Sequence, residues 1–179
     1  VEGWVTLVGH DLASDALLAG ASQLARDLGT SMTMHLSPTS SDPERYLERT
    51  GKRPVVHLDA LGALGPHLLL AHGVWLDDDE VDLVLSSGTA IAYCPWAYLR
   101  LGQGVCGHGR HAEIVERGGR VALGCDASNA GDSVDILRTA ARCGASFVDV
   151  DWRHALDLGE VRGTGKCHRI VSQHETEAT

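Results

Sequence analysis

Met34–Ser37 (MHLS), Leu70–Gly73 (LAHG) and Ala122–Asn129 (ALGCDASN) are the three stretches that decide the fold. Each is an apolar run that ends in a polar or metal-competent side chain, and each is followed by a loop and a helical pattern. In an α/β barrel the strands form the wall, and the residues at their carboxyl ends carry the chemistry. The three stretches therefore predict that two histidines and one aspartate meet at one end of a parallel sheet, where they could bind a divalent metal ion.

The same alternation of strand and helix runs along most of the chain. Strand patterns are centred near residues 5, 33, 70, 91 and 123, and apolar strands joined by helices predict an α/β fold with a parallel sheet covered on both faces. The helices are expected over Asp15–Leu28 after a Ser14 cap, from Asp42 to Gly51, over Val55–Leu61, from Asp77 to Gly88, over His111–Gly118 and over Val134–Arg142. The glycine-rich segment 102–109 is expected to be a flexible loop or lid.

The length of the chain limits how much of a barrel it can form. A complete eight-stranded α/β barrel needs about 250 residues, and this chain has 179. We therefore expect residues 1–146 to form a partial barrel. From Phe147 the strand–helix pattern stops, so residues 147–179 are expected to be a divergent, poorly ordered tail. The first residue is Val1 rather than Met, which fits a fragment or a processed start.

Charge and cysteine content exclude several classes of protein. The net charge of −9 argues against nonspecific binding to nucleic acid or to anionic membranes. The five cysteines include no CxxC pair, so we expect reduced thiols and a cytoplasmic location rather than a disulfide framework or a zinc ribbon. No apolar run is long enough for a membrane helix. The expected partners are a small-molecule substrate and further copies of the chain, because a partial barrel exposes sheet edges.

The candidate site residues have ordinary explanations as well as functional ones. His35 and His72 could be hydrogen-bonded histidines at strand ends, and Asp126 could cap the turn before the last helix. His10, at the end of the first strand, is a weaker candidate, because a contact with substrate there is implied only by the family resemblance described below. The remaining histidines are expected to lie on the surface or in helices, and Cys94 is a weak candidate nucleophile without an identifiable base.

Four motifs resemble the metal-dependent amidohydrolase superfamily, in the branch that holds cytosine and guanine deaminases, S-adenosylhomocysteine/methylthioadenosine deaminases and triazine chlorohydrolases. They are Gly51–Pro54 (GKRP), Leu58–Gly62 (LDALG), Leu70–His72 (LAH) and Asp126–Asn129 (DASN). The similarity covers roughly residues 4–141. The family fold is a (β/α)8 barrel, and the resemblance implies that this chain supplies about the fourth to eighth strands of such a TIM-type barrel.

The resemblance also implies roles for the residues that match. His35 would bind the metal, which is most often Zn and could be Fe or Mn. His72 would lie beside the metal and polarise the substrate or the attacking water. Asp126 would bind the metal and take a proton from the water. The implied reaction is hydrolysis of a C–N bond in a cyclic amidine or amide, such as a nucleobase-like or triazine-like ring.

Three departures from the family pattern qualify this reading. The His-x-His pair of the first barrel strand, which supplies two metal ligands, has no counterpart in the 179 residues. Pro38 stands where deaminases carry the glutamate that shuttles a proton, and Glu44 is six residues too late to replace it. Tyr98 and Arg100 replace a later Asn and Lys of the family, which suggests a different substrate contacted by these two residues. The alternative hypothesis is a truncated barrel fragment without catalytic activity.

Overall fold

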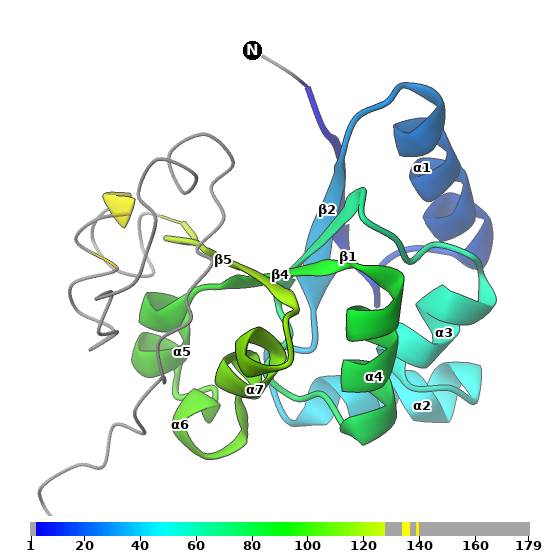
Figure 1. Cartoon of the computed structure of the whole chain (residues 1–179). Helices are drawn as coiled ribbons and strands as arrows, with labels where there is room; N and C mark the ends of the chain where they lie inside the picture. Colours follow the sequence, from blue (N-terminus) through cyan, green and yellow to red (C-terminus); the bar gives the residue numbers. More distant parts are fainter. Residues whose placement is uncertain (1–2, 128–133, 137–138, 140–179) are drawn as a thin grey trace, which may run out of the picture.

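The computed structural model describes residues 3–127, 134–136 and 139, and shows five parallel strands side by side in chain order (Figure 1). The strands are β1 (Val5–Gly9), β2 (Met32–Leu36), β3 (Leu68–His72), β4 (Ala90–Tyr93) and β5 (Arg120–Leu123). All four pairings are parallel. Each strand is joined to the next by at least one helix, as a parallel sheet requires. The prediction of an α/β fold built as part of a barrel is confirmed.

The helices lie where the sequence predicted them, with three differences. They are α1 (Asp15–Asp27), α2 (Ser41–Thr50), α3 (Pro54–Ala60), α4 (Asp78–Ser87), α5 (Pro95–Leu101), α6 (Val105–His108) and α7 (His111–Glu116). Ser14 caps α1 as predicted. Asp42 does not begin α2, because the helix starts at Ser41, and its carboxylate instead accepts a hydrogen bond from the Thr39 amide, 2.8 Å away.

The other two differences are α5 and α6, which occupy the region expected to be a flexible loop. Gly102 and Gly104 have positive φ and form the break between the two short helices. The Trp75 indole fixes the segment: Nε1 donates a hydrogen bond of 2.9 Å to the Gln103 carbonyl, and the ring stacks on His108. The glycines were correctly identified as turn residues, but this contact with a distant tryptophan has no signature in the local sequence.

The two faces of the sheet are covered unequally, which corrects the expectation that helices cover both faces. Met32, Met34, Leu36, Leu68 and Leu70 are buried against helices α1, α3, α4 and α7 on one face. On the opposite face, Thr33 and Leu69 are half-buried and Thr6, Val8 and His35 are exposed. A smaller cluster built around Tyr98 covers only the part of this face near β3 and β4. The open face is the one that lines the interior in a closed barrel.

A buried ion pair joins helices α3 and α4 on the covered side. The Glu80 side chain is fully buried, and it accepts hydrogen bonds from the Arg53 guanidinium and from the Val55 amide. Burial raises the pKa of Glu80, while these donors favour the charged form. Removing one partner of such a pair leaves an uncompensated charge, which typically costs about 3–5 kcal/mol. The GKRP motif therefore has a structural reason for its arginine.

Part of the C-terminal expectation lies outside the described residues. The structure does not describe the proposed tail, residues 147–179, or most of the expected helix Val134–Arg142. Three histidines expected on the surface or in helices, His154, His168 and His174, lie in the tail. Within the described residues, none of the helices combines the length and the apolar character that are needed to cross a bilayer.

We expect the 179-residue chain to associate with itself. In the described sheet, β1 and β5 each have one unpaired edge. Three apolar side chains lie exposed next to β1 or within it, namely Trp4, Val8 and Leu12, of which Val8 is 67% exposed. Open edges with apolar neighbours promote association. Sedimentation should therefore show dimers or larger species, and Val8→Lys should shift the distribution toward monomer. A compact monomer for the unchanged chain would contradict this expectation.

Candidate metal and catalytic site

The register of the sheet brings the predicted histidines together. Leu36 of β2 pairs with His72 of β3, and Gly9 of β1 pairs with His35 of β2. The side chains that follow β1, β2 and β3 therefore lie at the same edge. The imidazole rings of His35 and His72 stack with their centroids 5.1 Å apart, so the sequence-based prediction that these two side chains share the mouth of the sheet is confirmed.

Strained backbone shapes this edge. In the described part of the chain, the non-glycine residues with positive φ are Ser37, His72 and Asp126, and each follows or ends a strand. Such conformations cost on the order of 1–3 kcal/mol each and gather at functional sites. At His72 the consequence is visible. A regular strand would point its side chain the same way as Leu68 and Leu70, under the helices, but the positive φ turns the ring toward His35.

Asp126 reaches the same place from β5. Its Oδ2 lies 4.0 Å from His72 Nε2, and its side chain is 23% exposed. Oδ1 also accepts a hydrogen bond from the Ala127 amide. This local turn contact is the ordinary explanation that the sequence left open, and it coexists with the approach to His72. One carboxylate oxygen can serve the turn while the other faces the histidine.

His72 is held firmly and is neutral. Its carbonyl oxygen accepts hydrogen bonds from His111 Nε2 at 2.6 Å and from the Tyr98 hydroxyl at 3.3 Å. Its side chain is buried, and the ring nitrogen Nδ1 has no hydrogen-bond partner. Desolvation by burial lowers the pKa of His72 to about 4, against a smaller opposing effect of the Asp126 carboxylate. An uncharged imidazole with a free nitrogen can bind a metal or a polar substrate atom.

His35 is exposed on the open face of the sheet, and its ring has a defined tautomer. Nδ1 donates a hydrogen bond to the Val8 carbonyl, which leaves Nε2 as the nitrogen with the lone pair. Metal-binding histidines usually have one nitrogen fixed in this way. However, His35 does not belong to the cluster of possible metal ligands that the described residues form. In that cluster, one ligand atom each from His72, Cys94 and Asp126 lies within 4.8 Å of the other two.

His10 lies at the same edge, after β1. Its Nδ1 donates a hydrogen bond of 3.3 Å to the His35 carbonyl, and its ring packs on Tyr46. Nε2 is buried without a partner, and desolvation by burial lowers the pKa of the ring. The Nε2 atom of His10 is therefore an unused acceptor, while Nδ1 is taken up by the His35 carbonyl. Its role as a substrate contact stays a prediction.

The two other proposed substrate contacts have different surroundings. Tyr98 is only 1% exposed, and its hydroxyl accepts a hydrogen bond from the Cys94 amide while it donates to a backbone carbonyl. Because the hydroxyl also donates to the His72 carbonyl, this placement favours a role in holding the backbone of His72 rather than direct contact with a substrate. Arg100, two residues later in α5, is exposed. Its role as a substrate contact stays a prediction.

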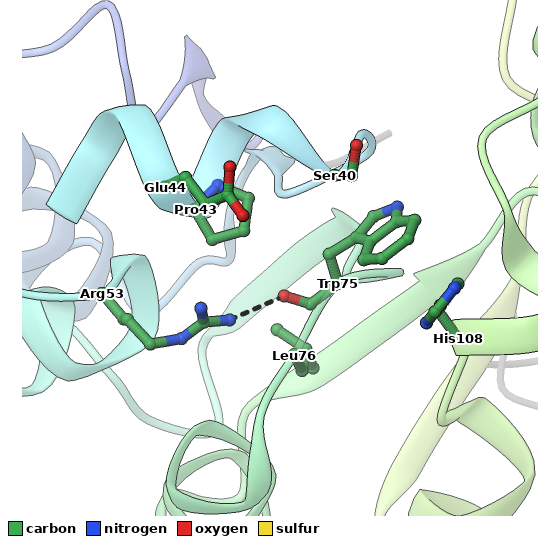
Figure 2. A pocket seen from close by; sticks show the side chains of 7 residues that line it. All are labelled: Ser40, Pro43, Glu44, Arg53, Trp75, Leu76 and His108. Carbon is green, nitrogen blue, oxygen red and sulfur yellow. Dashed lines mark hydrogen bonds between the residues drawn. The ribbon is translucent and has the colours of Figure 1, made fainter. Parts of the chain in front are cut away.

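A cavity of about 180 Å³ lies between α2, the segment after β3 and α6 (Figure 2). Its wall includes Glu44, Trp75 and His108, and Arg53 donates a hydrogen bond to the Trp75 carbonyl at its base. None of His35, His72 and Asp126 lines it. Glu44 thus faces a neighbouring cavity, which agrees with the view that it does not replace the glutamate missing at Pro38.

Sequence reasoning underestimated two residues. His111 was expected to be an ordinary surface or helix histidine, but it is a buried residue of α7 that holds the His72 carbonyl. His57 is likewise buried, with its Nδ1 2.9 Å from the Tyr46 hydroxyl.

Cys94 was a weak nucleophile candidate, and burial raises the pKa of its thiol to about 12, which argues against that role. Its position beside His72 and Asp126 depends on the pairing of β4 with β5, which a single motif does not reveal.

The lowered histidine pKa values predict a loss of stability in acid. Burial lowers the pKa of both His72 and His111 from 6.5 to about 4. Between these values the unfolded chain binds protons that the folded chain does not, so stability is full above pH 6.5 and falls as the pH approaches 4, by up to an order of 3 kcal/mol for each histidine. Urea midpoints measured with chelator across this range should show the loss. His111→Gln should flatten the curve, whereas His108→Gln, an exposed control, should not. An equal slope for His111→Gln and the unchanged chain would contradict the assignment.

Comparison with known proteins agrees with this geometry. Residues 10–159 match the amidohydrolase family, a range that extends beyond the expected boundary at residue 146. A 5-methylthioadenosine/S-adenosylhomocysteine deaminase from Pyrococcus abyssi is 35% identical over 121 residues, which is 68% of this chain and 28% of that protein. A 5′-deoxyadenosine deaminase from Methanopyrus kandleri is 32% identical over 124 residues, 69% of this chain and 28% of that protein.

Solved structures show the same fold. A zinc-bound adenosine deaminase from Xanthomonas campestris has a TM-score of 0.69 at 24% identity, over 76% of this chain and 31% of that one. A zinc-bound atrazine chlorohydrolase from Arthrobacter aurescens has a TM-score of 0.71 at 22% identity, over 78% and 30%. The chain thus spans less than a third of the length of these proteins. Over the part that it spans, it belongs to the amidohydrolase family.

Proposed function

We propose that this chain is part of a metal-dependent hydrolase that acts on a C–N bond in a cyclic amidine or amide. The observation that carries the proposal is the approach of His72 Nε2 to Asp126 Oδ2, 4.0 Å apart, at the carboxyl edge of a parallel sheet. A neutral imidazole and a carboxylate in this arrangement can act on a substrate from one side and on a water molecule from the other.

The residues at this edge fit a divalent metal. Imidazole nitrogen and carboxylate oxygen are suitable ligands for Zn, and also for Fe or Mn. His35, with its lone pair on Nε2, and Asp126 would hold the ion. Two ligands are fewer than the three or four that a tight site usually has, so further ligands would come from residues beyond these two. A bound divalent metal lowers the pKa of a water molecule to near 7.

Each remaining residue has a role that follows from its surroundings. Asp126 accepts a proton from the attacking water through the carboxylate oxygen that faces His72. His72 is neutral at physiological pH because of its burial, so it acts as a hydrogen-bonding group toward the substrate rather than as a cation. His10 offers its buried Nε2 as a second polar contact.

The relatives support a nucleobase-like ring as the substrate. The relatives from Pyrococcus abyssi and Methanopyrus kandleri are named as a 5-methylthioadenosine/S-adenosylhomocysteine deaminase and a 5′-deoxyadenosine deaminase. Pro38 stands where those enzymes would need a proton shuttle, which favours either a different proton path or a ring substituent other than an amino group. A triazine-like ring is the second candidate for this reason. We also propose a cytoplasmic enzyme that binds neither nucleic acid nor membranes.

The alternative is an inactive barrel fragment. The 179 residues contain no His-x-His pair, and the chain spans 28% of the Pyrococcus abyssi relative. A chimaera distinguishes the two proposals. In it, this chain replaces the matching segment of that deaminase, so that every strand of the barrel is present. Hydrolysis by the chimaera supports the enzyme, and a folded, metal-loaded but inactive chimaera supports the fragment.

In this chimaera, we expect Asp126→Asn to reduce turnover by orders of magnitude, because the substitution removes the base and weakens metal binding. His72→Asn should lower kcat while the metal content stays near that of the parent, since His72 is assigned to the substrate side when the His-x-His pair is present. Ammonia release from adenosine and methylthioadenosine, together with metal analysis, measures both effects. Full activity of Asp126→Asn would refute the assignment.

Pro38→Glu tests the missing proton shuttle. The substitution places a carboxylate three residues after His35, where deaminases carry one, so it should raise any weak release of ammonia. Pro38→Gln is the matched control, because it has nearly the same shape and no base. If Pro38→Glu is no faster than Pro38→Gln while the metal stays bound, the chain uses another proton path.

A further inference from the structure

We propose that His72, Cys94 and Asp126 form a zinc site that belongs to the 179-residue chain itself and includes a thiolate ligand. One ligand atom from each residue lies within 4.8 Å of the others. The site shares His72 and Asp126 with the proposed hydrolase, but it does not use His35 or a His-x-His pair. Its thiolate ligand, Cys94, has no part in the proposed reaction, so the two proposals are tested separately.

The geometry is close to that of a bound ion. Bonds to zinc of about 2.0–2.3 Å place tetrahedral ligand atoms about 3.3–3.8 Å apart. His72 Nε2 and Asp126 Oδ2, at 4.0 Å, are almost at this separation. Asp126 is the most exposed of the three, in the turn after β5, so its side chain has the most room to adjust to an ion. His72 is held in place through its backbone carbonyl.

Cys94 is held by its neighbours, and its thiol donates a hydrogen bond to the Ala92 carbonyl 3.7 Å away. Its amide donates a hydrogen bond of 2.8 Å to the Tyr98 hydroxyl, which fixes the start of α5. The space for the sulfur exists because residue 124 is glycine: a Cβ there would lie 2.7 Å from Cys94 Sγ. Any other residue at position 124 would collide with the thiol. The turn after β5 therefore leaves room for sulfur next to Asp126.

The buried polar atoms and the charges also favour an ion. His72 is only 5% exposed, so an ion held at its Nε2 beside Asp126 would be largely shielded from water. Zinc removes the proton from a coordinating thiol. One Zn²⁺, one thiolate, one carboxylate and one neutral imidazole sum to zero charge, and one proton is released to solvent. A neutral cluster is far less costly to bury than separate charges. Soft sulfur together with nitrogen and oxygen favours zinc over magnesium or calcium.

Cobalt(II) reports on the thiolate directly, because a Co–S bond gives a charge-transfer absorption in the near ultraviolet that nitrogen and oxygen ligands do not give. The metal-free chain is titrated with Co²⁺ in the presence of a phosphine reductant. We expect the band to saturate at one Co²⁺ per chain and to disappear when Zn²⁺ is added. A variant that keeps only Cys94, with the other four cysteines changed to serine, should show the same band.

Cys94→Ser should abolish the band and weaken Zn²⁺ binding, because it removes one of three ligands, whereas Cys125→Ser, the neighbour of Asp126 in sequence, should change neither. Cys125 Sγ instead lies 3.5 Å from Thr139 Oγ1. Urea unfolding of the metal-free proteins checks that the variants fold, and Cys94→Ala serves as a second variant that should behave like Cys94→Ser.

Three results would overturn the proposal: no Co²⁺ binding by the chain, a band that survives Cys94→Ser, or Co²⁺ bound without the band. The last result is what a His35–Asp126 site would give, and it leaves the proposed hydrolase intact. Conversely, an inactive chimaera together with a thiolate band that depends on Cys94 would refute only the reaction.

Discussion

The parallel order of the strands is the constraint on which the rest of the structure depends. Because β1 to β5 run the same way and pair in chain order, every carboxyl end lies on one edge. Residues as far apart in sequence as His10 and Asp126 are thus delivered to one place without any long-range motif. The backbone departs from regular geometry at this edge, with positive φ at Ser37, His72 and Asp126. The hydrogen bonds from His111 and Tyr98 to the His72 carbonyl help to hold one of these conformations in place.

The hydrophobic core and the exposed candidate ligand His35 lie on opposite faces of the sheet. Apolar side chains and the buried Arg53–Glu80 pair hold the helices on one face. On the other face, His35 is exposed, and so are Thr6 and Val8 of β1. His72 lies between these environments, because its strand belongs to the packed core while its ring is turned toward His35. Burial that keeps the imidazole uncharged therefore comes from the same packing that stabilises the fold.

Sequence patterns predicted the parts of this structure that local chemistry determines. The strands, the Ser14 cap and the positions of His35, His72 and Asp126 at strand ends all follow from the order of apolar residues and turn residues. The patterns did not predict α5 and α6, because their placement depends on the contact between Trp75 and the Gln103 carbonyl. They also did not predict the burial of His111 or the approach of Cys94 to Asp126. Both depend on which strands and helices become neighbours, and no single stretch of sequence encodes that information.

Both proposals require a metal at the carboxyl edge of the sheet, with Asp126 as a ligand. Crystals of the chain grown with Zn²⁺ test for this metal through anomalous scattering at the zinc absorption edge. We expect an anomalous peak about 2.0–2.2 Å from an Asp126 carboxylate oxygen, with either His35 or the His72–Cys94 pair as further ligands. A peak elsewhere, such as at His57 and Asp15 on the far side of Tyr46, or no peak at all at this edge, would contradict it.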